Sequence, residues 1–185
     1  MLEEKNGNFK KYKIIYADPP WKYRRTAVQG AAEFHYPCMS RDELKNLNVK
    51  DIADKDCVLF MWATFPQLQE ALDLIRAWGF QYKTIAFVWL KLNKKGKGFF
   101  YGLGFWTRGN AEICLLATKG KPKRKSKSVH QLIISPLRKH SQKPDEARQK
   151  IIDLLGDIPR IELFAREKID GWDVWGNEVL NDIIL

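Results

Sequence analysis

Short apolar runs bounded by turn residues recur along the chain and are typical of buried strands. The first run covers residues 14–17 and stops at two consecutive prolines, which cannot continue a central strand. Four further runs of the same kind cover residues 57–62, 85–90, 112–118 and 160–165. This pattern predicts strands at all five places.

Helical patterns fall between these runs. Ser40 and Glu43 form a capping box, with Met39 and Leu44 placed for a hydrophobic staple, so a helix is expected to begin there. Two further helices are predicted, one from Pro66 to Gly79 and one from Pro144 to Gly156. Their apolar stripes are Leu68, Ala71, Leu72, Ile75 and Trp78 in the first, and Ala147, Ile151, Leu154 and Leu155 in the second.

Strands that alternate with helices predict an α/β sheet with helices on both faces. A length of 185 residues suits one domain, so we expect a single domain over residues 1–185. The aromatic side chains of Tyr82, Trp89 and Trp106 are expected to pack in its interior. No apolar run approaches the ~20 residues of a transmembrane helix. The charged start of the chain lacks the apolar core of a signal peptide, so a cytoplasmic location is expected.

The net charge of +10 favours a polyanionic partner. Many of the basic residues are concentrated in two loops without apolar faces. The first loop holds Lys91, Lys94, Lys95 and Lys97, and the second holds Lys119, Lys121, Lys123, Arg124, Lys125 and Lys127. We expect these loops to contact nucleic acid rather than a membrane or solvent alone.

Several other classes of site are disfavoured. The three cysteines are widely spaced and the histidines are scattered, so neither a metal site nor a disulfide framework is predicted. Gly96, Gly98 and Gly102 only loosely resemble a dinucleotide-binding fingerprint, and no amphipathic helix follows them. A Walker A phosphate loop does not occur either.

The sequence Asp18-Pro19-Pro20-Trp21 follows the first predicted strand directly. Ligands of open α/β sheets bind at such carboxyl ends. Asp18 and the Pro19 carbonyl can each accept an N–H of an exocyclic base amine, which stabilises the positive charge that grows during methyl transfer. Trp21 can pack against the base. Taken alone, the four residues fit equally well a proline-rich turn with an aspartate cap.

Two further motifs change that balance. They are His140-Ser141-Gln142-Lys143-Pro144-Asp145-Glu146 and Ile161-Glu162-Leu163-Phe164-Ala165-Arg166. Together with the Asp-Pro-Pro-Trp sequence, they make the chain resemble the MT-A70 family of adenine-N6 methyltransferases. The final Gly171-Trp172-Asp173-Val174-Trp175-Gly176-Asn177-Glu178 is similar to the closing motif of the family's prokaryotic and phage branch.

The resemblance implies a Rossmann-like sheet in permuted motif order and S-adenosylmethionine (SAM) as the methyl donor. It implies that Asp18 and Pro19 hold the target amine, with Pro20 and Trp21 completing the catalytic motif. Tyr36 and Glu112 match residues near the target base, and Lys143 matches a residue that bridges the base and the cofactor. Asp18, Lys143, Arg166, Asn177 and Glu178 are the implied cofactor contacts, and Lys121, Lys123, Arg124 and Lys125 are our candidates for DNA contact.

The sequence leaves several alternatives open. Lys168, Ile169 and Glu178 differ from the pattern of the RNA-modifying members, which favours DNA over RNA. Cytosine-N4 methylation has a similar amine geometry, but that class more often carries Ser at the position of Asp18. A catalytically inactive nucleic-acid-binding subunit is a further alternative, and a homodimer or a second subunit is compatible with the sequence. We expect an adenine-N6 methyltransferase that flips its target base out of DNA.

Overall fold

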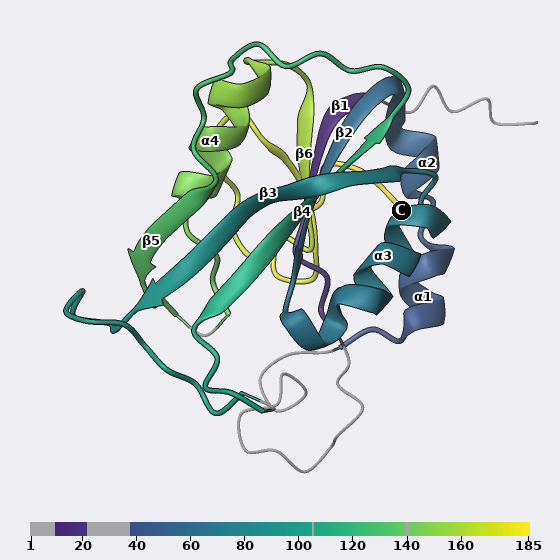
Figure 1. The fold of residues 1–185 in the computed structure, drawn as a ribbon. Helices are drawn as coiled ribbons and strands as arrows, with labels where there is room; N and C mark the ends of the chain where they lie inside the picture. Colours follow the sequence, from purple (N-terminus) through teal and green to yellow (C-terminus); the bar gives the residue numbers. More distant parts are fainter. Residues whose placement is uncertain (1–9, 22–37, 105, 140) are drawn as a thin grey trace, which may run out of the picture.

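The computed structural model describes residues 10–21, 38–104, 106–139 and 141–185. Seven strands form one sheet in the order β5-β3-β4-β2-β1-β6-β7 (Figure 1). In chain order they are β1 Tyr12–Ala17, β2 Ala53–Ala63, β3 Gln81–Leu92, β4 Ala111–Lys119, β5 Leu132–Pro136, β6 Arg160–Leu163 and β7 Asp173–Trp175.

The directions of the strands place most carboxyl ends at one edge of the sheet. Strand β1 lies parallel to both β2 and β6, and β6 lies parallel to β7. Only β4 runs against its neighbours β2 and β3, so its first residues reach the same edge as the ends of the others. Because β1 lies between β2 and β6, this edge also contains a topological switch point, where ligands of α/β sheets bind.

Helices cover both faces of the sheet, as the sequence predicted (Figure 1). One face carries α1 Arg41–Asn46, α2 Val49–Ile52 and α3 Leu68–Ala77, which follows a short 3₁₀ turn, η2 Phe65–Gln67. The other face carries α4 Glu146–Leu155. Successive residues of a strand point to opposite faces, so Ile15 packs beneath the first group and Ile14 beneath α4.

The structure confirms most predicted elements and shifts several boundaries. The capping box of Ser40 and Glu43 is present, and all five predicted strands form. The last strand ends at Leu163 rather than residue 165, because Phe164 adopts a left-handed backbone with φ of 62°. The helix after Pro66 buries Leu74, whereas Leu68 is exposed.

Two strands were not predicted from the sequence. Strand β5 is an edge strand that leaves Leu132 and Ile134 exposed, so it lacks the buried run used to find the others. Strand β7 is only three residues long and lies at the opposite edge. Among the described residues, no helix has the length and hydropathy needed to span a membrane.

Candidate active site

The candidate active site is a pocket at the carboxyl edge of the sheet. It receives Asp18 from the end of β1, Thr64 from the end of β2, Phe164 from the end of β6 and Asn177 from beyond β7. Glu112 reaches it from the start of β4, which runs in the opposite direction. Residues that are distant in the sequence therefore meet because these strand ends share one edge.

The Asp-Pro-Pro-Trp turn forms one wall of this pocket. The Pro19 carbonyl accepts the Trp21 N–H at 2.8 Å, and the Pro20 carbonyl accepts the Met39 N–H at 3.1 Å. The Trp21 ring is mostly buried, and its Nε1 donates to the Trp62 carbonyl at 3.2 Å. A carbonyl oxygen has two lone pairs, so Pro19 keeps capacity for a second donor.

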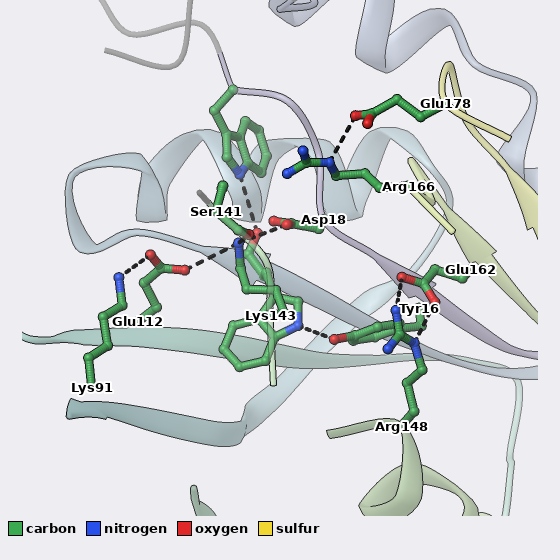
Figure 2. A network of polar contacts seen from close by, with 12 residues as sticks. Tyr16, Asp18, Lys91, Glu112, Ser141, Lys143, Arg148, Glu162, Arg166 and Glu178 are labelled. Atoms are coloured by element: carbon green, nitrogen blue, oxygen red, sulfur yellow. Dashed lines mark hydrogen bonds and ion pairs between the residues drawn. The ribbon is translucent and has the colours of Figure 1, made fainter. Parts of the chain in front are cut away.

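Lys143 links two carboxylates of the pocket, Asp18 and Glu112 (Figure 2). Its Nζ donates to Asp18 Oδ2 at 2.7 Å and lies 3.3 Å from Glu112 Oε2. The same ammonium donates to the Ser141 carbonyl at 3.2 Å, and its side chain is only 10% exposed. Lys91 completes the chain of charges with a 2.5 Å bond to Glu112 Oε1.

These charges act differently on the two acids. Burial raises the pKa of Asp18 above its ordinary value, and the adjacent Lys143 ammonium only partly opposes that effect. Burial would raise the pKa of Glu112 too, but Lys143 and Lys91 together outweigh it and lower that pKa. Glu112 is therefore the more firmly ionised acid, whereas the charge of Asp18 depends on what else enters the pocket.

The pocket also holds Arg166, Asn177 and Glu178, three of the residues that the sequence assigned to the cofactor. Arg166 Nε donates to Glu178 Oε1 at 2.8 Å, and Asn177 lines the pocket beside them. Gly176 allows β7 to approach β6 closely, since a Cβ at that position would lie 2.2 Å from the Ala165 carbonyl oxygen. This close approach fixes where Asn177 and Glu178 enter the pocket.

A second polar cluster supports the floor of the site from the α4 side (Figure 2). Arg148 binds Glu162 with two hydrogen bonds, of 2.7 and 2.9 Å, and thereby ties α4 to β6. The buried Tyr16 hydroxyl accepts the Trp62 Nε1–H at 2.6 Å and joins β1 to β2. These bonds hold rigid the strand end that carries Asp18.

Nine residues chosen from the sequence therefore line one pocket. They are Asp18, Pro19, Pro20, Trp21, Glu112, Lys143, Arg166, Asn177 and Glu178. Tyr36 lies outside the described residues, and its contact with the base stays a prediction. The grouping required the parallel strand arrangement, which no single motif contains.

The second basic loop lies elsewhere. It follows β4, whose last residue Lys119 pairs with Cys57 at the start of the apolar run in β2, whereas Ala63 marks the pocket end of that strand. Lys121, Lys123, Arg124 and Lys125 follow at this distant edge, and most of their surface is open to solvent. The backbone N–H of Lys121 is anchored by Asp56 at 2.7 Å. The structure thus separates these four residues from Asp18.

Sequence reasoning missed several residues that line the pocket or contact its lining. Lys91 was counted only as part of a basic loop, although it pairs with Glu112. Ser141, with a left-handed φ of 59°, turns its carbonyl toward Lys143. Thr64 and Phe164 also line the pocket, and their positions directly after β2 and β6 are the signal that would have identified them.

The sheet order, the switch-point pocket and its carboxylates define a Rossmann-like methyltransferase. The chain belongs to the MT-A70 family, whose model matches residues 12–178. It is 37% identical to the type II methyltransferase M.MunI of a Mycoplasma species, over 92% of this chain and 78% of that protein.

Eukaryotic relatives match the same region less closely. The chain is 30% identical to the N(6)-adenosine-methyltransferase MT-A70-like protein of Drosophila melanogaster over 91% of its length. It is 28% identical to the N(6)-adenosine-methyltransferase catalytic subunit METTL3 of Homo sapiens, also over 91%. It spans only 27% and 28% of these two proteins.

Proposed function

We propose that this protein is a SAM-dependent adenine-N6 methyltransferase that acts on DNA. The observation that carries the proposal is the meeting of Asp18, Lys143 and Glu112 at 2.7 and 3.3 Å beside the Pro19 carbonyl. This arrangement offers a partly buried carboxylate and a carbonyl to one amine. The family membership supports the reaction class, and the carboxyl-edge pocket supports the place where it occurs.

The pocket's chemistry fits SAM. Phe164 and Trp175 provide apolar surface, and Asn177 and Glu178 provide acceptors suited to ribose hydroxyls. Bound there, SAM supplies an electrophilic methyl group carried on a sulfonium. The carboxylate of Asp18 is complementary in charge to such a cation.

Asp18 and Pro19 position the adenine amine of the substrate. The lone pair of an adenine amine is delocalised into the ring, so the amine is a weak nucleophile until its N–H groups are polarised. Asp18 accepts one of these N–H groups and the remaining lone pair of the Pro19 carbonyl accepts the other. Both acceptors stabilise the positive charge that develops on nitrogen, and no covalent protein intermediate is required.

Lys143 and Glu112 set the charge state of this site. In the structure, Lys143 holds Asp18 in place and neutralises part of its charge. Glu112 in turn holds Lys143, so the ammonium does not swing out toward solvent. The network therefore preorganises the acceptor before substrate arrives, which lowers the reorganisation needed in the transition state.

DNA is proposed over RNA for two reasons. The chain is more similar to the type II methyltransferase than to the adenosine methyltransferases, with identities of 37% against 28 to 30%. Lys168, Ile169 and Glu178 also depart from the pattern of RNA-modifying members. RNA remains the second candidate function, because the adenosine methyltransferases match over the same residues.

The test is methylation of mixed DNA and RNA pools with labelled SAM, followed by identification of the modified base. We expect N6-methyladenine in DNA. The control is Asp18→Ala, which should lower the rate about 10²–10³-fold, the typical cost of losing a transition-state acceptor. Methylation confined to RNA would overturn the DNA assignment, and wild-type turnover in Asp18→Ala would overturn the mechanism.

A second subunit is part of this proposal. Target recognition then rests on the loops around the pocket, on another copy of the chain or on a partner. Sedimentation of the purified protein with and without DNA would show whether the active form is monomeric. A monomer with full activity and site preference would remove the need for a partner.

A further inference from the structure

The segment between β3 and β4, described at residues 93–104 and 106–110 and called here the β3–β4 loop, projects from the pocket edge of the sheet (Figure 1). Lys91 lies at the end of β3, just before the loop, and Glu112 lies at the start of β4, just after it, and these two residues are joined by the 2.5 Å bond. Glu112 leads through Lys143 to Asp18. The base of this loop is therefore part of the catalytic network itself.

The loop carries an unusual combination of side chains. Trp106 is 99% exposed, although a residue of this size is normally well buried. The sequence led us to expect Trp106 in the interior, so the structure overturns that interpretation. The loop exposes further large apolar side chains, namely Phe99, Tyr101 and Leu103.

All charged side chains of the same loop are basic. Lys94, Lys95, Lys97 and Arg108 are exposed along it, and the sequence of residues 91–110 contains neither aspartate nor glutamate. An apolar surface that packs against a partner protein would not require an excess of basic residues. Cations interleaved with exposed aromatic rings suit a nucleic-acid strand, whose phosphates attract the cations and whose bases stack on the rings.

The backbone of the loop holds Trp106 in this exposed position. The Gly102 N–H donates to the Gly109 carbonyl at 2.7 Å, which closes a small turn around Trp106. Gly104 has a left-handed φ of 65°, and a Cβ there would lie 1.8 Å from the Thr107 carbonyl oxygen. Only glycine fits this turn, so a defined backbone conformation holds the Trp106 ring in its exposed position.

We propose that the β3–β4 loop binds an unpaired nucleic-acid strand next to the pocket, with a base stacked on Trp106. This inference rests on the proposed function, because base flipping leaves unpaired nucleotides at the pocket edge. Lys94, Lys95 and Lys97 contact the backbone of that strand. The loop thereby retains the opened strand while its adenine occupies the pocket.

The test compares Trp106→Ala and Trp106→Phe with wild type for binding of a fluorescent single-stranded oligonucleotide. Losing one stacked base weakens binding roughly 5- to 150-fold, so we expect a loss in that range for Trp106→Ala and little loss for Trp106→Phe. Tyr82→Ala is the matched aromatic control, since Tyr82 is 41% exposed at the far end of β3. Unchanged binding in Trp106→Ala would overturn the proposal.

The charged part of the loop is tested separately. Lys94→Gln with Lys95→Gln should flatten the log–log salt dependence of single-strand binding by roughly 0.7 for each phosphate that is no longer neutralised. Lys45→Gln with Lys50→Gln, two exposed lysines in α1 and α2, should leave the slope unchanged. An equal change in both double variants would overturn the assignment of phosphate binding to this loop.

Two further measurements distinguish strand binding from self-association, and the failure of the loop proposal from the failure of the proposed function. Sedimentation of Trp106→Ala should match wild type. A change from dimer to monomer would show that the loop binds another copy of the chain, and would overturn the proposal. Methylation of DNA by wild type is measured in parallel. If wild type methylates DNA and Trp106→Ala binds the single strand normally, only the role proposed for the loop is refuted. If wild type binds the single strand but methylates no DNA, the proposed function is refuted.

Discussion

At the scale of single residues, the site depends on how burial and charge are balanced between Asp18 and Glu112. Burial is common to both carboxylates, but Glu112 faces two cations and Asp18 chiefly one. The pKa of Asp18 is therefore raised and that of Glu112 is lowered. A carboxylate with a raised pKa gains more from a cationic ligand, because such a ligand stabilises its charged form.

This balance predicts a pH dependence. If Asp18 must be ionised to accept the amine, kcat/KM falls as the pH drops through its raised pKa in the unliganded protein. Lys143→Met removes the ammonium that opposes the effect of burial, so the pKa rises further and the acid limb moves to higher pH. The measurement is kcat/KM against pH for both proteins. Lys83→Met, far along β3, should not move the limb, and an unmoved limb in Lys143→Met would contradict the role given to Asp18.

At the scale of elements, the spacing of β6 and β7 decides where the residues proposed to bind the cofactor lie. Gly176 sits where β7 passes Ala165, and Asn177 and Glu178 follow at once. The sheet also separates two regions by the length of β2, with the pocket at one end and the basic residues after β4 at the other.

Gly176→Ala should weaken SAM binding. Its Cβ would lie 2.2 Å from the Ala165 carbonyl oxygen, so β7 must move and displace Asn177. Such overpacking should also cost roughly 1–3 kcal/mol of stability. Calorimetry with SAM measures the first effect and urea unfolding the second. Gly109→Ala is the control, because its Cβ meets nothing closer than 3.9 Å at an ordinary φ. Equal SAM affinity in both variants would show that β7 does not position the cofactor.

The basic residues after β4 should matter only for long DNA. Residues 57 to 63 of β2 span about 20 Å at roughly 3.3 Å per residue. A six-base-pair duplex centred on the pocket extends only about 10 Å to each side at roughly 3.4 Å per base pair, so it does not reach the basic residues. Changing Lys121, Lys123, Arg124 and Lys125 to Gln should weaken binding of a 30-base-pair duplex, with a salt slope flattened by roughly 0.9 for each phosphate released. Binding of a six-base-pair duplex should not change. Equal affinity for the long duplex in variant and wild type would show that these residues are solvated and do not contact DNA.

At the scale of the whole molecule, the sheet is a rigid platform with its functional groups at one edge. Helices cover both faces, and the bonds of Arg148 to Glu162 and of Trp62 to Tyr16 tie neighbouring elements together behind the pocket. A ligand that binds between the ends of β1, β6 and β7 should therefore stabilise the entire fold.

Saturation with SAM should raise the melting temperature. A ligand present at 100 times its Kd adds about 2.7 kcal/mol, and a chain of this size gains roughly 2–4 °C for each kcal/mol. We therefore expect a rise of roughly 5–10 °C in a thermal-shift measurement. The double variant Arg166→Ala, Asn177→Ala should respond less at the same SAM concentration. No shift at any attainable SAM concentration would favour the catalytically inactive subunit that the sequence left open.

The sequence by itself determined the class of fold and most of the pocket. Apolar runs located five strands because buried strands exclude polar residues, and the capping box located a helix because its bonds are local. Asp18 was identified from the chemistry of its contiguous motif, and Lys143 and Arg166 were identified because their motifs resemble those of the MT-A70 family. Local interactions and contiguous motifs can be read along a chain without knowledge of its fold.

Only the tertiary structure decided which of these residues meet. The antiparallel direction of β4 brings Glu112 to Asp18 and carries Lys121 to the opposite edge, although both belong to one strand and its following loop. The structure also revealed that Lys91 belongs to the charge network of the pocket and that Trp106 is exposed rather than packed. Strand direction depends on pairing between distant segments, so hydrophobic pattern and motif spacing do not contain it.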